Sequence, residues 1–571
     1  MKYPLPRDSF APPFAPDAYT PAEKWQLVPF FSNLDQSVYA PLIFSPEVIG
    51  ALCSRASRAE DDLRTIFLRE YVAPFLEPET AATEAAAHHG KSLKEFINFL
   101  QAYPIEEIFS NPRARSFYAK WLAQYGDDSI AQMAGMHLVF ASLSQVAIKH
   151  FEDQRIGLAP IEKSTRYVDY STKINGRWRY YTDPTLRELG LEQAYETAMD
   201  GLFTTYGQLL PRLIRWLSER FPEEKRSVVE KKAFDVLRGL LPTSTLSQVA
   251  FFGNGQAYEY LVSRSGHHPL GEIRWASERA YEELYKVAPS FLRRIKDPES
   301  QALVNSYQEY LSGKGERLRP LVDRFTAAHQ KVAQQTKEET SVKLLEYDLE
   351  GEAKVITGML YAAPNNHASW SDIFSRVRAL NESERQVVLN AYFIGRTQRW
   401  QKVGRALENI FVRFEIMMNI GAWRDLHRHR MLTQQRQYFS CMHGYDVPPE
   451  LMSAGLADEF TEAIERVERV HQHIAEYDLD LAQYAVTMAH RVRFMQWTNL
   501  RECFWEIELR TIPEGHPDYR RIEQEKFRLL QKVYPLLAER MHVNLDEYNF
   551  ARRGQEEKIQ AKLKELTKVN A

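Results

Sequence analysis

Cysteine is scarce in this chain of 571 residues, which contains three: Cys53, Cys441 and Cys503. They lie far apart and form no CxxC pair. We therefore expect neither a disulfide framework nor a thiolate zinc site, and a reducing cytoplasm is the natural setting. Long apolar runs are absent as well, so no transmembrane helix is expected. The first residues are rich in proline and aromatics and lack the apolar core of a signal peptide.

Neither sign of charge dominates. The chain has 73 Lys and Arg against 76 Asp and Glu, which gives a formal net charge of −3. Proteins that bind nucleic acids or membrane surfaces are usually basic, so neither partner is expected. Several motifs are missing too: there is no Walker loop and no HExxH metal site, and "GNGQAY" (253–258) lacks the third glycine and the preceding strand of a dinucleotide fingerprint.

Apolar residues recur at helical spacing through most of the chain, which predicts a mostly helical α+β protein. The stretches "DDSIAQMAGMHLVFASLSQVAIKH" (127–150) and "GRALENIFVRFEIMMNIGAW" (404–423) each predict a long buried helix. "RYVDYS" (166–171) and "WRYYT" (178–182) have the character of strands. Residues 1–40 are expected to form an extended arm, and the highly charged residues 311–345 a linker.

The two halves of the chain share landmarks in the same order. Each long apolar stretch ends in a polar triplet, Asp153-Gln154-Arg155 in one and Arg428-His429-Arg430 in the other. Further on, each half has an Asn, then an Arg about three turns later, then a turn resembling Gly-His-Pro. Helical sequences can match by chance, but three ordered landmarks favour a duplication. We therefore predict two copies of one domain, at 41–310 and 346–571.

The triplet Arg428-His429-Arg430 could bind a ligand only where the helix ends. On a continuing helix, side chains two residues apart point to nearly opposite sides. Beyond a helix end the three can fan around one ligand, and arginine forks match phosphate oxygens. The alternative is a solvated helix end.

A second constellation lies in "APIEKSTRYVDYS" (159–171). If this segment is extended, Glu162, Ser164 and Arg166 share one face. Ser and Arg suit a phosphate, and Glu suits a base or sugar donor; the alternative is a polar edge strand. Four further arginines lie in half-buried settings, where a buried guanidinium needs an anionic partner: Arg238, Arg264, Arg501 and Arg510. Cys503 is expected to be a core residue rather than a nucleophile.

These residues resemble those of the flavin-dependent thymidylate synthases. That family has a helix with an early Glu, then Arg-His-Arg, a Glu-x-Ser-x-Arg-Tyr loop, an Arg before Leu-Pro, and Asn-x-Arg followed by Leu-x-Arg. The second half keeps the triplet with Glu408, Asn499, Arg501 and Arg510, but has "TQQRQYFS" in place of the loop and Gln483 in place of the Arg before Leu-Pro. The first half keeps Glu162, Ser164, Arg166, Tyr167, Arg238 and Arg264, and retains only Arg155 of the triplet.

The complementary losses imply a division of labour. In the family, four subunits build active sites at their interfaces, with the flavin near the triplet and deoxyuridylate near the Ser-x-Arg loop. The second copy would then hold FAD through Arg428, His429, Arg430, Glu408, Asn499 and Arg501. The first would hold the nucleotide through Glu162, Ser164, Arg166 and Arg238. Arg510 and Arg264 are the candidate catalytic residues, which would hold the phosphate or polarise the uracil carbonyls.

The resemblance implies the fold and the reaction as well. The fold would be two copies of a domain with helices around a small antiparallel sheet. The reaction would be methylation of deoxyuridylate to thymidylate in the cytoplasm, with methylenetetrahydrofolate and NADPH as co-substrates and no metal. Two such chains, as a homodimer, would mimic a tetramer. Two alternatives stay open: a catalytically degenerate protein that binds flavin or nucleotide as a regulator or scaffold, and an unrelated helical interaction protein.

Overall fold

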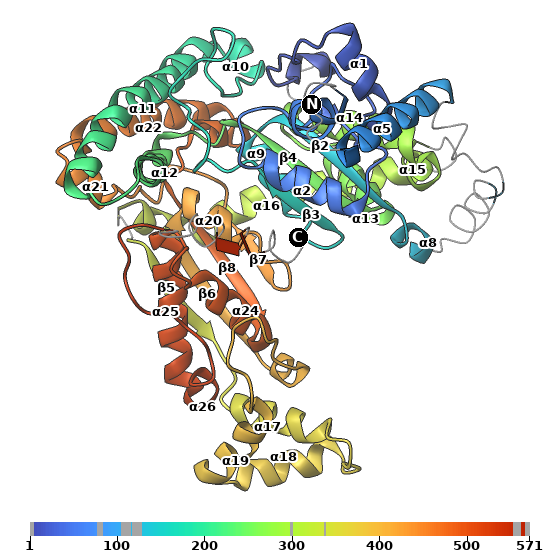
Figure 1. Cartoon of the computed structure of the whole chain (residues 1–571). Helices are drawn as coiled ribbons and strands as arrows, with labels where there is room; N and C mark the ends of the chain where they lie inside the picture. Colours follow the sequence, from blue (N-terminus) through green and yellow to red (C-terminus); the bar gives the residue numbers. More distant parts are fainter. Residues whose placement is uncertain are drawn as a thin grey trace. The chain divides into compact units, whose positions relative to one another are not determined.

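The computed structural model describes residues 5–76, 84–103, 113, 116, 128–296, 301–335, 339–551, 561–562 and 564–565. The chain divides into two compact units (Figure 1). The first comprises Met1–Leu213, Phe234–Lys331 and Pro449–Thr487, and the second Ile214–Ala233, Val332–Pro448 and Met488–Ala571. Each unit thus includes a helical segment from the other half of the sequence. No helix among the described residues is both long and apolar enough to cross a bilayer.

Each unit contains one four-stranded antiparallel sheet, and the two sheets have the same strand order. The first runs β1-β2-β4-β3 and the second β5-β6-β8-β7. The strands are β1 Val38–Tyr39, β2 Gly135–Ser144, β3 Leu158–Glu162 and β4 Leu246–Asn254, then β5 Ser341–Glu346, β6 Phe411–Asn419, β7 Thr433–Arg436 and β8 Arg491–Asn499. This confirms the predicted α+β fold with two copies of one domain.

The two predicted long buried helices are wrong. The first stretch contains α8 Asp128–Gln132, β2 and α9 Gln145–Glu152, and the second contains the short 3-10 helix η7 Arg405–Asn409, β6 and α20 Ile420–Leu426. Ser144 and Asn419 start the helices, because their side chains accept hydrogen bonds from the N–H groups of Ala147 (3.0 Å) and Ala422 (2.9 Å). The middle of each stretch is therefore a strand, and only its last residues form the helix.

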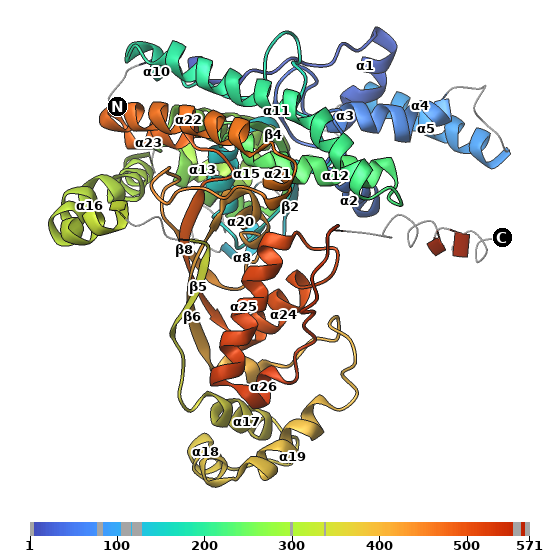
Figure 2. The same ribbon diagram turned by 90° about the vertical axis from the view of Figure 1, so that its left-hand side faces the viewer.

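The same strand–helix unit recurs further along each copy. β4 leads into α13 Gly255–Ser265 and β8 into α24 Leu500–Arg510, capped by Asn254 and Asn499 respectively. The following helices, α14 Gly271–Val287 and α25 Pro517–Val533, bind the earlier caps. Glu272 accepts from Ser144, and Asp518 accepts from Asn419 at 2.9 Å. These equivalent contacts align the two copies, with Glu272 of α14 at the position of Asp518 of α25. Figure 2 shows α24 and α25 beside the second sheet.

The remaining elements are mainly helices. In the first unit they are η1 Arg7–Phe10, α1 Pro21–Leu27, η2 Val28–Phe30, α2 Pro46–Ala56, α3 Leu63–Ile66, the π-helix η3 Phe67–Val72, α4 Ala73–Leu76, α5 Glu84–Ala102, α10 Thr185–Glu188, η6 Arg238–Leu240, α15 Pro289–Lys296, α21 Pro449–Ser453, α22 Ala457–Tyr477, α23 Leu479–Ala482 and η8 Gln483–Ala485. Helices α11 Glu192–Arg220, α12 Arg226–Leu237 and α16 Gln301–Gln335 begin or end there. The second unit adds α17 Gly351–Tyr361, α18 Trp370–Ala379, α19 Glu382–Phe393 and α26 Pro535–Ala538.

The expected arm and linker have more structure than the sequence suggested. Phe30, Phe31 and Tyr39 from the arm lie in an apolar cluster with residues of α2, α3 and η3, because their rings need burial. Much of the charged linker belongs to α16, and its last residues form the edge strand β5. Neither "RYVDYS" nor "WRYYT" forms a strand; Tyr180 makes one isolated bridge with Thr245.

Glu272 is a fully buried carboxylate in the first unit. It accepts hydrogen bonds from Ser144 N (2.8 Å), Ser144 Oγ (2.6 Å) and Tyr484 Oη (2.8 Å). Burial nevertheless raises its pKa from 4.5 to about 7. The folded protein therefore binds this proton more tightly than the unfolded chain does. Its contribution to stability falls as the pH rises from about 4.5 to about 7.

Replacing Glu272 by glutamine should consequently reduce the dependence of stability on pH. The drop in melting temperature between about pH 5 and about pH 8 should be several degrees smaller than in the wild type. Glu282→Gln is the control, since Glu282 lies on the same helix and its side chain is 38% exposed. An equal drop in wild type and Glu272→Gln would show that this carboxyl does not titrate in that range.

Candidate functional site

The triplet Arg428-His429-Arg430 lies on the turn between α20 and β7. Helix α20 ends at Leu426, and the N–H of His429 donates to the Leu426 carbonyl at 3.1 Å. The helix thus ends before the triplet, as a shared ligand site requires. The three side chains nevertheless differ in orientation: Arg428 and Arg430 are exposed, whereas His429 is only 4% exposed.

His429 is held between two groups of α24. Its Nδ1 lies 3.0 Å from Glu502 Oε1, and Arg510 Nε donates to its Nε2 at 2.9 Å. A guanidinium can only donate, so Nε2 must accept and the proton must lie on Nδ1, facing Glu502. The structure therefore brings His429 and Arg510 together. It does so in a network of the protein's own side chains, with the imidazole as one defined neutral tautomer.

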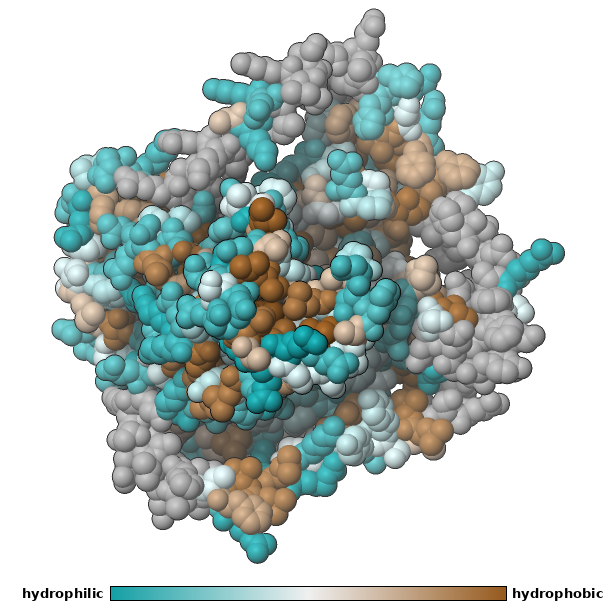
Figure 3. Space-filling model, turned by 90° about the horizontal axis from the view of Figure 1, so that it is seen from below, coloured by the Kyte–Doolittle hydropathy of each residue, from teal (hydrophilic) through white to brown (hydrophobic). Residues whose placement is uncertain are grey.

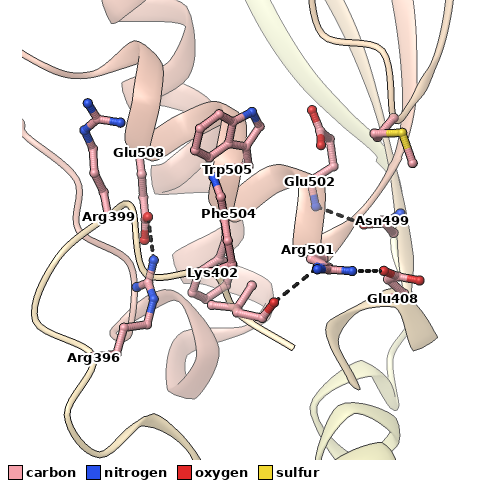
Figure 4. A pocket seen from close by; sticks show the side chains of 12 residues that line it. Arg396, Arg399, Lys402, Glu408, Asn499, Arg501, Glu502, Phe504, Trp505 and Glu508 are labelled. Carbon is pink, nitrogen blue, oxygen red and sulfur yellow. Dashed lines mark hydrogen bonds and ion pairs between the residues drawn. The ribbon is translucent and has the colours of Figure 1, made fainter. Parts of the chain in front are cut away.

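A pocket of about 360 Å³ includes Glu502 of this network in its lining. Figure 4 shows the pocket from close by. Three of the residues predicted to bind the cofactor line it: Glu408, Asn499 and Arg501. Met431, directly after the triplet, and Glu502, the partner of His429, line it as well. The full set of lining residues is Arg396, Arg399, Lys402, Val403, Glu408, Met431, Asn499, Arg501, Glu502, Phe504, Trp505 and Glu508. The triplet itself is not part of the lining.

Arg501 and Glu408 form one side of the pocket. Arg501 Nη1 donates to Glu408 Oε1 at 2.5 Å, and its Nε donates to the Val403 carbonyl at 3.1 Å (Figure 4). The two side chains are 38% and 42% exposed, so water screens the pair and its net stabilisation is small. Asn499 is fixed by its role as cap of α24. The guanidinium of Arg501 is therefore positioned but remains accessible to an anion.

The other side consists of cations and aromatic rings. Arg396 Nη2 donates to Glu508 Oε2 at 2.6 Å, which fixes the loop after α19 against α24. The Lys402 ammonium lies 2.8 Å from the centroid of the Trp505 ring. Desolvation lowers the pKa of Lys402, and the nearby charge of Arg399 lowers it further. Such a lining suits a planar ring attached to an anionic group.

Sequence reasoning missed this basic loop. The segment "RTQRWQK" (396–402) combines cations with an aromatic residue, and this pattern could have indicated a binding loop.

Figure 3 views the end of the second unit that carries α17–α19, where apolar side chains gather among polar ones. Ile394, which precedes the basic residues of this loop, and Trp400, which lies among them, are 84% and 66% exposed.

The predicted extended face of Glu162, Ser164 and Arg166 is wrong. Strand β3 ends at Glu162 and the chain turns at residues 165–167, so the three side chains do not share a strand face. Glu162 is buried and binds the ammonium of Lys149 at 2.8 Å, which also binds Glu152 at 2.6 Å. The N–H of Ser164 donates to the Ser57 carbonyl at 2.9 Å.

Two of the predicted nucleotide-binding arginines do meet. Arg166 Nε lies 2.9 Å from Asp235 Oδ1, and Arg238 Nη1 lies 3.6 Å from the same oxygen. Arg238 starts η6 ahead of β4, and Gln483 starts η8 ahead of β8, so Gln483 occupies the position of Arg238 in the second copy. Both arginines are buried, and the second copy has Gln483 where the first has Arg238.

Arg264 and Arg510 are not at equivalent positions. Helices α13 and α24 both have 11 residues after their capping Asn, and Arg510 is the last residue of α24. The last residue of α13 is Ser265, whose Oγ lies 2.9 Å from His150 Nε2. Arg264 lies one position earlier and is half-buried. Cys503 is fully buried, and burial raises the pKa of its thiol, as expected for a core residue.

The two halves match a known family separately. A family model described as thymidylate synthase complementing protein, Thy1, matches residues 75–290 and 343–536. The chain belongs to the Thy1 family. The first match contains β2 to β4, and the second contains most of β5 and all of β6 to β8. The repeated sheet therefore belongs to a Thy1 domain that is present twice.

Two of the curated relatives match over most of the chain, and other matches cover a smaller part of it. A UPF0159 protein of Chlamydia pneumoniae is 32% identical over 91% of this chain and 94% of its own. A UPF0159 protein of Thermoplasma acidophilum is 30% identical over 86% and 93%. A flavin-dependent thymidylate synthase of a Mycobacterium species (strain JLS) is 23% identical over 38% of this chain and 84% of its own. Among solved structures, a UMP/dUMP methylase from Streptomyces cacaoi bound with 5-Br dUMP has a TM-score of 0.28 at 13% identity, covering 36% of this chain and 94% of its own.

Proposed function

We propose that this duplicated Thy1 protein is an enzyme that methylates deoxyuridylate to thymidylate, with FAD as cofactor and methylenetetrahydrofolate and NADPH as co-substrates. The observation that carries the proposal is the complementary retention of site residues. The second copy has an accessible Arg501 in a pocket with aromatic and cationic walls. The first copy has Arg166 and Arg238 converging on Asp235.

The second-copy pocket has the donors that part of a flavin nucleotide needs. Arg501, Arg399 and Lys402 would bind the phosphates, and the Trp505 ring offers a face for a planar group. Met431 and Glu502 place this pocket next to the His429–Arg510 network. A bound FAD would supply hydride transfer, and these side chains would bind and orient it. The exposed Arg428 and Arg430 would extend the binding surface towards the triplet.

For the nucleotide we assign the first-copy arginines. Arg166 and Arg238 would bind the phosphate of deoxyuridylate, because arginine forks match phosphate oxygens in pairs. Asp235 holds both guanidinium groups and would keep them in place. Arg510 would contribute a positive charge next to the reacting ring. The proposal includes a homodimer of the duplicated chain, whose mass light scattering would measure.

A second candidate is a protein of the same fold that binds flavin or nucleotide without catalysis. It is favoured by Glu162, which is tied to Lys149 rather than open to a ligand, and by Gln483 at the position of an arginine. Flavin occupancy with no turnover is the expected behaviour of this candidate.

The visible absorption spectrum of the purified protein, before and after addition of deoxyuridylate, tests the proposal. We expect oxidised-flavin bands that change on addition, because the pyrimidine and the flavin would share a site. Cytidylate is the control nucleotide and should leave the bands unchanged. A protein that stays colourless after reconstitution with FAD would overturn the flavin assignment and with it the enzyme proposal.

A further inference from the structure

A network of buried polar side chains joins α24, which lines the second-copy pocket, to α25 and β8. The Lys526 ammonium of α25 binds Glu506 Oε2 of α24 at 2.6 Å, Glu523 Oε1 of α25 at 3.1 Å and Gln496 Oε1 of β8 at 2.9 Å. The amide nitrogen of Gln496 donates in turn to Glu506 Oε1 at 3.0 Å. All four side chains are fully buried. We call Lys526, Glu506, Glu523 and Gln496 the lysine cluster.

The lysine cluster holds one ammonium and two carboxyl groups. Burial raises the pKa of Glu523 to about 8, and the charge of Glu506 adds to the increase. Burial also opposes ionisation of Glu506, but the charge of Lys526 brings its pKa below the ordinary value. At neutral pH Glu523 therefore keeps its proton and Glu506 is ionised. With the charged Lys526, the cluster then has no net charge. The Phe414 ring lies 5.4 Å from the ammonium, and the Cys503 thiol lies near it as well.

The cluster is adjacent to the His429 network. Glu502, Glu506 and Arg510 follow each other at intervals of four residues, so they share one face of α24. Glu502 and Arg510 bind the two nitrogens of His429, and Glu506 lies between them in the sequence and binds Lys526. The charge of Arg510, which donates to His429, acts on Glu523 of the lysine cluster. The two networks are therefore coupled through one helix face.

The first copy has the same fold without this cluster. In the register set by the capping Asn, Leu261 and Phe251 occupy the positions of Glu506 and Gln496. In the register set by Glu272 and Asp518, Ser277 and Ala280 occupy those of Glu523 and Lys526. All four first-copy residues are buried. The fold does not need buried charges here, and buried ion pairs usually add little stability over an apolar packing.

We infer that the lysine cluster is a set of positioning residues for the triplet. It fixes α24 against α25 and β8, so that Glu502 and Arg510 hold His429 in one neutral tautomer beside the pocket. This placement of His429 stands independently of any cofactor. Its role in ligand binding rests on the proposed function.

The test replaces the cluster by the residues of the first copy in one variant, Gln496→Phe, Glu506→Leu, Glu523→Ser and Lys526→Ala. The readout is the pair of imidazole nitrogen resonances of His429 in protein labelled with ¹⁵N-histidine, assigned by comparison with His429→Gln. In the wild type we expect one tautomer with the proton on Nδ1, because Nε2 accepts from Arg510. In the folded four-residue variant we expect a mixture of the two tautomers. An unchanged tautomer would overturn the inference.

Glu523→Gln is the milder variant, which decides the question if the four-residue variant does not fold. It keeps Lys526 and Glu506 but replaces the Glu523 carboxyl, which ionises near pH 8, by an amide that stays neutral. The wild-type His429 resonances should shift as the pH passes about 8, and this shift should be absent in Glu523→Gln. Identical pH responses in both proteins would overturn the inference.

FAD titration of the same proteins separates this inference from the proposed function. If FAD binds the wild type, we expect roughly tenfold weaker binding to the four-residue variant. Glu523→Gln should bind FAD at every pH as the wild type does below about pH 8, because its amide stays neutral. If the wild type does not bind FAD but the His429 resonances behave as expected, the proposed function fails and the positioning role stands.

Discussion

Replacing Arg166 by alanine should weaken deoxyuridylate binding by roughly 100-fold, while the protein keeps its FAD. A charge-assisted, bidentate contact from a buried guanidinium to a phosphate contributes up to about 3 kcal/mol, which corresponds to this factor. The Asp235 carboxylate would keep a cationic partner in the variant, because Arg238 Nη1 remains 3.6 Å from it. The fold should therefore survive, and isothermal titration with deoxyuridylate measures the loss.

Arg501→Ala is the matched variant in the other copy. Arg501 lines the second-copy pocket, and its partner Glu408 is exposed enough to be solvated without it. We expect this variant to lose FAD, seen as a loss of the flavin bands, and to bind deoxyuridylate within about twofold of the wild type. The reverse pattern, with FAD lost from Arg166→Ala and retained by Arg501→Ala, would contradict the assigned division of labour.

The duplication could be predicted from the sequence because its landmarks lie where helices begin or end. Asn254 and Asn499 both cap the helix that follows the last strand of their sheet, which constrains residue type locally. The triplets follow helices that end in the same way. Local rules of this kind are visible without the fold, and the shared strand order confirms the two copies.

The strands β2 and β6 could not be recognised in the same way. Phe411, Phe414 and Met418 match helical spacing, but Val412, Phe414 and Ile416 also alternate at the spacing of a strand. Both strands are central in their sheets, where side chains on both faces are buried. A central strand then appears as a nearly continuous apolar run, which periodicity alone does not distinguish from a buried helix.

The candidate site was predictable only in part for a related reason. Glu408, Asn499 and Arg501 were named from motif positions, and they line one pocket. Arg396, Arg399 and Lys402 lie about a hundred residues before α24 in the sequence and reach it through tertiary packing, as in the contact of Arg396 with Glu508. The inward orientation of His429 likewise depends on Glu502 and Arg510, whose distance from the triplet no local pattern reveals.

Replacing Trp423 by alanine should have the largest effect on stability. Trp423 lies on α20 and is fully buried. The centroid of its ring lies 4.6, 5.6 and 6.4 Å from the ring centroids of His427, Phe439 and Phe494. Its Nε1 donates to Gln434 Oε1 of β7 at 3.2 Å. Removing so large a buried side chain leaves a cavity and should lower the free energy of unfolding by about 3–5 kcal/mol. Urea unfolding followed by far-ultraviolet circular dichroism measures the change.

Trp400→Ala is the control, because Trp400 is 66% exposed and its removal should cost about 0.5 kcal/mol or less. The triplet lies between α20 and β7, the two elements that Trp423 connects, so its loss should also loosen the turn that carries His429. The His429 resonances should then change in Trp423→Ala under conditions where the variant is still folded. Equal stability of the two variants would mean that α20 does not depend on this contact, and that the lysine cluster and α24 hold the triplet by themselves.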